Sequence, residues 1–324
     1  MTEKFSRFWF VLFVTAVIVT NIRVEAAQRQ LIKLTVGYTP ISGATLPFYV
    51  ALDENSFQKY GFDVTPVFMG GSPLINSAIL AGEFPIGYTG GGAIISSRLA
   101  GSDLISIGCP LPVLTIDAWA KPEIKSVSDL RGKRIGVTRF GASTHFAALS
   151  MLDSAGIKAN EVTFIQNGGV GESLAALLGG RVDATMIGYP FGLRAKNAGY
   201  PLLFRPMDSE YGLFPTAVIA ARESWLKDQR NRKLAIEFLR ALNEGLQLTR
   251  ESPNAVKRAL RKYTRVNDEA MLQGSVEYFH DAFPSSLRTR EKVMTNALKF
   301  IDHPKAKQYD VTQSFDNSLV EEIK

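Results

Sequence analysis

The chain has 324 residues, of which 46 % are hydrophobic and 21 % are charged, and this ordinary globular composition excludes a wholly disordered chain. Its formal net charge of +6 at pH 7 is compatible with an anionic ligand, but it is too small to indicate nucleic-acid binding without a basic block. The length predicts about two domains.

A short apolar run near the beginning of the sequence predicts export. Residues 8–19 follow Lys4 and Arg7 and are almost all apolar, but they are fewer than the roughly 20 residues that span a bilayer. Val24 and Ala26 then occupy the −3 and −1 positions of a signal-peptidase site. We therefore expect a signal peptide over residues 1–26, cleavage near Ala26 and a periplasmic protein. A retained membrane anchor is the alternative.

Strands and helices then alternate in two similar series. The first series is predicted as strand 34–40, helix 44–60, strand 62–69, short helix 73–81 and strand 85–89. The second begins about 100 residues later, with strand 134–138, helix 143–155, strand 162–166, short helix 172–178 and strand 183–187. Two β-α-β-α-β units at a fixed offset favour two similar α/β lobes. The general rhythm of α/β proteins is the alternative explanation.

The remaining segments divide into extended and helical ones. Residues 104–111, 113–120 and 211–221 are expected to be extended and to cross between the lobes. Helices are predicted on the first lobe over residues 223–250, 253–263, 267–279 and 288–302.

Loops rich in glycine and small polar residues follow the predicted strands. In open α/β sheets ligands bind outside the carboxyl ends of the strands, so a ligand is expected between the lobes, with hinge closure around it. Ser72 and Ser143 lie at predicted helix starts, where free N–H groups favour an anion. Plain helix caps are the alternative for both serines. Gly90 to Gly92 could approach a ligand closely or could form only a tight turn.

Other side chains near these loops allow two interpretations each. Arg139 could neutralise a ligand anion or face solvent. His145 could donate a hydrogen bond to a ligand, or could contact solvent or a capping group. Trp119 and Phe140 could line an apolar wall of the site or belong to the core.

Sequence signatures of enzymes and metal sites are missing. The chain has neither a G-x-S-x-G nor an H-E-x-x-H motif, and its three histidines are dispersed without the spacing of metal ligands. Cys109 is the only cysteine, so stability has to come from the core rather than from an internal disulfide. We therefore expect that the protein is not an enzyme and that it binds neither a metal ion nor a cofactor.

Several segments resemble one family. Residues 126–137 are similar to the beginning of the second lobe of periplasmic substrate-binding proteins. Gly141-Ala-Ser-Thr-His145 and residues 178–184 resemble the nitrate/sulfonate/taurine-binding branch, the SsuA/THI5-like or NMT1-like group, and residues 34–60 resemble its opening. The resemblance covers about residues 31–248. The cysteine-rich motif of the THI5 enzymes cannot be supplied by a chain with one cysteine, which disfavours that branch.

The resemblance implies an α/β, type II periplasmic binding protein fold with two lobes joined by two crossovers. Residues 27–115 and 212–324 would form lobe I, and residues 116–211 would form lobe II. The expected function is capture of a small anionic molecule (sulfonate-like, nitrate-like or carboxylate) for an ABC permease in the inner membrane, by a monomer. The alternatives are an exported enzyme on the same fold, a neutral aromatic or pyrimidine-type ligand, and a ligand-sensing partner of a membrane receptor.

The resemblance also implies which residues face the ligand. From the first lobe these are Ser42, Gly43, Gly71, Ser72, Thr89, Gly90 and Gly91, and from the second lobe Ser143, Thr144, His145 and Tyr189. Trp119 and Arg139 complete the expected ligand-binding set.

Overall fold

The structure, a computed structural model, describes residues 30–323. The expected signal peptide and its cleavage site near Ala26 lie outside the described residues. Residues Lys33–Lys324 form one unit, which contains both sheets and the candidate site.

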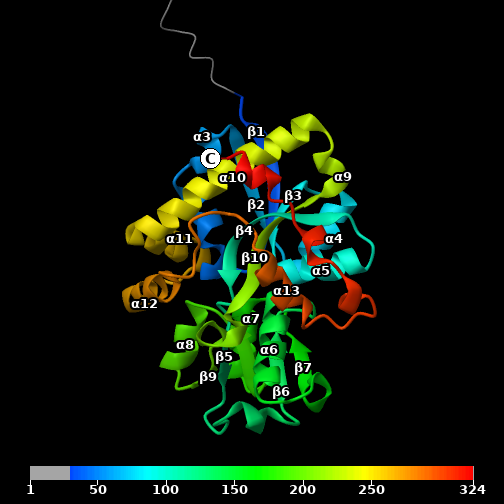
Figure 1. Cartoon of the computed structure of the whole chain (residues 1–324). Coiled ribbons are helices and arrows are strands. Elements are labelled where there is room, and N and C mark those ends of the chain that lie inside the picture. The colour runs from blue at the N-terminus through cyan, green and yellow to red at the C-terminus, as the bar shows by residue number, and fades with distance from the viewer. Residues whose placement is uncertain (1–29, 324) are drawn as a thin grey trace, which may run out of the picture. The chain divides into compact units, whose positions relative to one another are not determined.

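Two five-stranded mixed sheets form the two lobes, as predicted (Figure 1). The first sheet has the order β2-β1-β3-β10-β4, with β1 and β3 parallel and β10 antiparallel to both β3 and β4. The second has the order β7-β6-β8-β5-β9, with β6 parallel to β7 and β8, and β5 antiparallel to β8 and β9. The strand bounds are β1 Ile32–Tyr38, β2 Phe62–Phe68, β3 Ile86–Thr89, β4 Leu104–Val113, β5 Asp117–Ala120, β6 Arg134–Val137, β7 Thr163–Gln166, β8 Ala184–Ile187, β9 Leu202–Phe204 and β10 Leu213–Arg222.

The chain passes between the sheets twice. It leaves the first sheet at the end of β4 and returns to it at the start of β10, where Val113 and Leu213 are paired. Both strands are ten residues long and almost completely buried, because neighbours cover both faces of the sheet. This topology confirms the two predicted crossovers. The exact lobe bounds, 27–115 with 212–324 and 116–211, remain a prediction.

Helices cover both sheets. The α-helices are α2 Leu46–Asp53, α3 Ser56–Lys59, α4 Ser72–Ala81, α5 Gly91–Leu99, α6 Ser143–Ser154, α7 Val170–Leu178, α8 Phe191–Asn197, α9 Glu223–Leu226, α10 Gln229–Glu251, α11 Pro253–Thr264, α12 Glu269–Phe279, α13 Glu291–Leu298 and α14 Ser318–Glu321. Short 3-10 turns complete the set: η1 Gly43–Thr45, η2 Val127–Leu130, η3 Ala159–Glu161, η4 Pro206–Asp208, η5 Glu210–Gly212, η6 Ala306–Gln308 and η7 Val311–Ser314.

Several helices differ from the sequence-based expectation. The helix predicted over 44–60 is divided into α2 and α3, because Asn55 between them has a φ of +57°, and α8 was not predicted. The helix predicted over 223–250 is divided into α9 and α10, because the Asp228 side chain accepts a hydrogen bond from the Arg230 amide and caps a new helix. Residues 91–99 form α5 although they begin with two glycines. Burial of Ile94 and Ile95 against the core stabilises this helix despite the low helix propensity of glycine.

The long helix α10 packs closely on helix α2 of the first lobe. Gly245 of α10 lies against α2, and a Cβ atom at Gly245 would come within 2.4 Å of the Pro47 carbonyl oxygen. The two helices therefore pack with their backbones nearly in contact. Within residues 30–323, no helix has both the length and the apolar character needed to cross a bilayer.

Candidate ligand-binding site

A small cavity lies between the two lobes. Its volume is about 20 Å³, which is enough for one or two water molecules. Anything larger therefore requires the lobes to separate. The lining comes from the loops after β1, β2 and β6 and from both crossovers, and consists of Thr39, Pro40, Gly71, Ser72, Ile116, Thr138, Ala142, Ser143, Thr144 and Thr216.

The N-termini of three helices meet beside this cavity. Helix α4 begins at Ser72, α5 at Gly91 and α6 at Ser143. Gly90 lies between them, and a Cβ atom there would come within 2.5 Å of Ser143 Oγ and 2.9 Å of Ser72 Oγ. The first amides of a helix lack intrahelical acceptors and carry the positive end of its dipole. The arrangement therefore suits a negatively charged group.

Ser72 and Ser143 do not cap their own helices. The N-cap residues of α4 and α6 are Gly71 and Ala142, so the plain-cap interpretation is wrong for both serines. Ser72 Oγ accepts a hydrogen bond from the Gly90 amide at 3.0 Å. Ser143 Oγ donates to the Thr216 carbonyl oxygen at 3.1 Å, which ties α6 to the returning crossover.

Four threonines, Thr39, Thr138, Thr144 and Thr216, complete the polar part of the lining. Thr144 Oγ1 accepts a hydrogen bond from the Thr138 amide at 2.9 Å, and the two hydroxyl oxygens are 2.7 Å apart. The side chain of Thr216 is buried, and its Oγ1 has no hydrogen-bond partner among residues 30–323. A buried hydroxyl without a partner is costly. Its position on the cavity wall suits a hydrogen bond to a ligand.

Two predicted residues of the first loop lie outside the cavity. Ser42 Oγ accepts a hydrogen bond from the Ala44 amide at 3.2 Å and so caps η1. The Gly43 amide donates to the Tyr189 carbonyl oxygen at 3.0 Å. This backbone hydrogen bond joins the two lobes, so Gly43 contributes to their contact rather than to the cavity wall.

Thr89 and Gly91 also lie behind the cavity wall. Thr89 is fully buried, and its hydroxyl donates to Asn76 Oδ1 at 3.2 Å within the first lobe. A Cβ atom at Gly91 would come within 2.5 Å of Pro215 Cβ, so the start of α5 packs directly on the returning crossover. Of the first-lobe set, Gly71 and Ser72 reach the cavity, and Gly90 lies beside it.

Arg139 spans the two lobes at the edge of the cavity. Its Nε donates a hydrogen bond to the Gly70 carbonyl oxygen at 3.1 Å, and its side chain passes beside Gly71. Gly71 has a φ of +119°, a backbone conformation that favours glycine. Arg139 is thus within the interlobe contact, although it does not line the cavity itself.

His145 faces away from the cavity. Its Nδ1 accepts a hydrogen bond from the Gly141 amide at 3.3 Å, and its ring packs edge-on against Phe140 and Phe164. Burial lowers the pKa of His145 to about 4. The imidazole is therefore neutral at pH 7 and supplies no positive charge to a ligand.

Trp119 and Tyr189 belong to a buried hydrophobic cluster that contains residues of both lobes. Their ring centroids are 6.5 Å apart, and neither ring lines the cavity. Tyr189 stacks instead on Tyr278 of α12, with ring centroids 3.9 Å apart and planes inclined by 10°.

Sequence reasoning missed both crossover residues of the lining. Ile116 and Thr216 lie in segments that were expected to cross between the lobes, but no motif marks them as ligand contacts. Thr39 and Thr138 belong to the glycine-rich loops that indicated the site, although they were not among the expected residues. The position of Thr39 and Thr138 at the ends of predicted strands is the sequence signal that could have identified them as ligand contacts.

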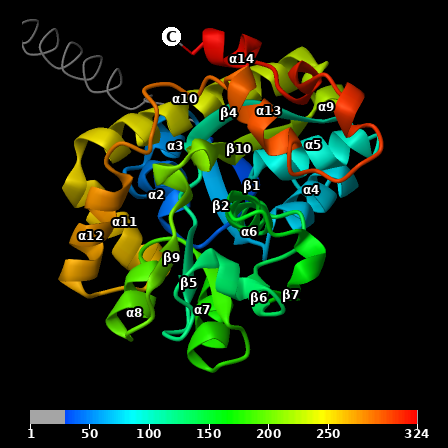
Figure 2. The same ribbon diagram turned by 60° about the horizontal axis from the view of Figure 1, so that its bottom comes forward.

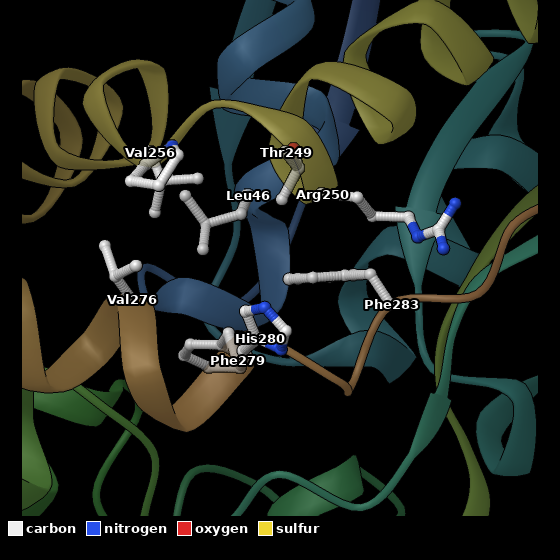
Figure 3. A pocket seen from close by; sticks show the side chains of 9 residues that line it. Leu46, Thr249, Arg250, Val256, Val276, Phe279, His280 and Phe283 are labelled. Carbon is white, nitrogen blue, oxygen red and sulfur yellow. The ribbon is translucent and has the colours of Figure 1, made fainter.

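A second cavity lies within the first lobe and is mostly apolar. Its volume is about 20 Å³, and Figure 3 shows its side chains converging from α2, α10, α11 and α12. The Thr249 hydroxyl in its lining donates a hydrogen bond to the Gly245 carbonyl oxygen at 2.7 Å, within α10, rather than into the cavity. No group of potential metal ligands occurs in the part of the chain that the structure describes. The interlobe cavity is the candidate binding site because three helix N-termini and the loops after β1, β2 and β6 meet there.

Solved structures with the same fold bind different small molecules. A protein of Bordetella bronchiseptica RB50 superposes with a TM-score of 0.79 at 19 % identity, over 90 % of this chain and 96 % of that one. The alkanesulfonate-binding protein SsuA of Xanthomonas axonopodis pv. citri, bound to MOPS, gives 0.69 at 19 % identity, over 92 % and 99 %. The periplasmic nitrate-binding protein NrtA of Synechocystis PCC 6803 gives 0.69 at 12 % identity, over 91 % and 88 %.

These likenesses establish the fold, which is that of periplasmic binding proteins. A comparison with curated proteins found no match. The family model described as NMT1/THI5 like matches residues 43–256, which is well over half of the chain. The chain therefore belongs to the NMT1/THI5-like family, as its motifs indicated.

Proposed function

We propose that this chain is the solute-binding component of an ABC importer and that it captures a small anion between its two lobes. Its family and the sulfonate-binding and nitrate-binding proteins that share its fold support this assignment. We also propose that the chain is exported to the periplasm as a monomer after cleavage near Ala26, and that it delivers its ligand to a permease in the inner membrane.

The convergence of three helix N-termini is the observation that carries the proposed ligand charge. The starts of α4, α5 and α6 surround Gly90, and no carboxylate lines the cavity beside them. Backbone amides and serine or threonine hydroxyls are good donors to an oxyanion. The unpartnered hydroxyl of Thr216 points to the same conclusion, because it can donate a hydrogen bond to a ligand oxygen.

The charge balance favours an anion with a single charge. Arg139 is the nearby cation at the edge of the cavity, and part of its guanidinium already contacts the Gly70 carbonyl. His145 is neutral at pH 7 and so adds no countercharge. A sulfonate, nitrate or carboxylate group matches such a site better than a doubly charged group, whose burial would need a second cation.

Closure of the lobes provides the mechanism of capture. Hydrogen bonds that join them include those of Arg139 to Gly70, of Gly43 to Tyr189, and of Ser143 to the Thr216 carbonyl. Because the cavity of this arrangement holds only one or two water molecules, a ligand that bridges the helix starts would favour a closed arrangement with the lobes slightly farther apart, over the open one. The closed protein would then present a surface from both lobes to the permease.

The cavity supports capture rather than chemistry. The lining offers hydroxyls but no histidine, carboxylate, amine or thiol that could act as a base or nucleophile. The Ser143 hydroxyl donates to a carbonyl oxygen and not to a base. We therefore propose that the chain binds its ligand without turnover.

Calorimetric titration of the purified protein with nitrate, methanesulfonate, acetate and uracil tests this proposal. We expect binding of at least one anion. Replacing Ser143 by alanine should weaken it by about 1–2 kcal/mol, the scale of a hydrogen bond to a charged group. Ser154→Ala is the matched control, because Ser154 lies at the other end of α6 and donates to the Met151 carbonyl. If only uracil binds, the proposal of an anionic ligand is refuted. If a product forms, the proposal of binding without turnover is refuted.

A second experiment tests the role in transport. Deletion of the gene should abolish uptake of the bound anion by the cells from which the protein comes, and the gene supplied in trans should restore it. Amino-terminal sequencing of the periplasmic fraction should begin near residue 27. Unchanged uptake in the deletion strain would contradict the importer assignment even if the anion binds.

A further inference from the structure

Helix α12 connects the two lobes at a place distant in sequence from both crossovers. Figures 1 and 2 show α12 beside α8 of the second lobe, although in the sequence α12 directly follows α10 and α11 of the first lobe. A Cβ atom at Gly274 of α12 would come within 3.1 Å of Leu193 Cδ1 of α8. The two helices are therefore in contact.

One side of α12 is anchored in the first lobe. Val276 and Phe279 face Leu46 and Val256 across the small apolar cavity (Figure 3). Phe279 also packs on η1, since a Cβ atom at Gly43 would come within 2.1 Å of the Phe279 ring. The apolar contacts of Phe279 fix α12 to the first lobe, so α12 moves with that lobe during any hinge motion.

Tyr278, the preceding residue, reaches the second lobe instead. Its ring stacks on Tyr189 with centroids 3.9 Å apart. Its hydroxyl donates a 2.8 Å hydrogen bond to Oδ1 of Asp117, the first residue of β5. Asp117 is completely buried. A single side chain of the first lobe thus enters a site in the second lobe that is formed by Asp117, Tyr189 and Arg205, which we call the socket.

The second lobe supplies the rest of this socket by itself. Arg205 Nε donates to Asp117 Oδ2 at 3.4 Å, and Arg205 Nη2 donates to the Tyr189 hydroxyl at 3.3 Å. The Arg205 guanidinium also lies 5.5 Å from the centroid of the Tyr278 ring. These contacts hold Asp117 and Tyr189 in position, so the socket is organised before Tyr278 enters it.

We propose that Tyr278 is a positioning residue that stabilises the closed arrangement of the lobes by entering the Asp117–Tyr189–Arg205 socket. Opening of the lobes removes the stacked ring and the hydrogen bond to a buried carboxylate, both of which favour closure. None of the four residues lines the ligand cavity. Tyr278 therefore acts on ligand affinity through the ratio of closed to open molecules. The effect on affinity rests on the proposed function, whereas the effect on closure does not.

Fluorescence energy transfer between the lobes tests this proposal in the full-length protein. Glu123→Cys in the second lobe and Lys233→Cys on α10 provide exposed labelling sites. Cys109 is the only native cysteine, and it is buried. The ligand-free protein should populate a short and a long interlobe distance, and methanesulfonate serves as the anion probe.

The variants separate the interlobe contact from the loss of an aromatic ring. Tyr278→Ala should lower the closed-to-open ratio by roughly 30-fold or more, as expected when one stacked pair and one charged hydrogen bond are lost. Tyr278→Phe keeps the ring and should lower the ratio less. Tyr263→Ala is the matched control, because Tyr263 stacks on Tyr49 within the first lobe, with centroids 4.3 Å apart. It should leave the ratio unchanged.

The proposal is overturned if Tyr278→Ala retains the closed population, if Tyr263→Ala lowers it equally, or if the unaltered ligand-free protein shows only the long distance. Failure of the proposed function has a different signature. In that case no anion would bind to any variant, while Tyr278→Ala would still shift the interlobe distance.

Discussion

Gly90 offers a direct test of the convergence of the three helix starts. Its backbone lies in the extended region, with φ −94° and ψ 138°, so alanine fits the backbone without strain. The added methyl group, however, would lie 2.5 Å from Ser143 Oγ and 2.9 Å from Ser72 Oγ. Ser143 belongs to the second lobe, and the first contact therefore exists only while the lobes are closed.

The cost of Gly90→Ala should fall mainly on the closed state. Separations below 3.0 Å require the neighbouring atoms to move, and overpacking of this kind costs typically about 1–3 kcal/mol. In the open state only Ser72 is close, and its hydroxyl can rotate away at the loss of one hydrogen bond of about 1 kcal/mol. We therefore expect anion affinity to fall by roughly 5- to 150-fold, with a smaller loss of stability.

Calorimetric titration with the anion that binds best, together with interlobe energy transfer, measures this effect. Gly171→Ala is the control, because Gly171 lies in the first turn of α7 and a Cβ atom there has no neighbour within 4 Å. The control should bind and close normally. Normal affinity and normal closure of Gly90→Ala would refute the inference that α4, α5 and α6 converge on the ligand.

Three further predictions concern the Thr216 hydroxyl, the buried carboxylate of Asp117 and the contact of α10 with α2. Thr216→Val should weaken anion binding by about 1–2 kcal/mol if the unpartnered hydroxyl donates to the ligand, and equal affinity in calorimetry would contradict this. Burial raises the pKa of Asp117 to about 6, so the stability it contributes is fully present below pH 4 and is lost as the pH rises through 6, by about 3 kcal/mol. Denaturant unfolding of Asp117→Asn should lack this loss, and an identical pH profile for both proteins would refute it. Gly245→Ala should destabilise the fold by about 1–3 kcal/mol or more, because its methyl group would meet the Pro47 carbonyl; an unchanged melting temperature would disprove that tight contact.

The charge environment of the site could not be read from residue types alone. Arg139 and His145 are near the expected anion site in sequence, and both are cationic candidates. The structure gives them different roles, because Arg139 crosses to the Gly70 carbonyl while His145 is half-buried and packs against two phenylalanine rings. Burial lowers the pKa of His145, and burial is a property of the packed chain.

Loop sequences indicated the region of the site more accurately than its individual contacts. Gly71, Ser72, Ser143 and Thr144 were expected at the ligand, and all four line the cavity. Ser42 instead caps η1. These roles differ because the side chains of neighbouring loop residues point in different directions, and short motifs do not specify those directions.

The sequence by itself determined the two α/β lobes, the crossovers and the family. These features depend on local patterns: the alternation of buried strands with amphipathic helices, the glycines after strand ends, and motifs in a fixed order. Only the tertiary structure decided which groups meet between the lobes. The contacts of Gly90 with Ser143 and of Tyr278 with Asp117 join residues 53 and 161 positions apart. Such pairings form where the two lobes meet, and no local pattern in the chain records them.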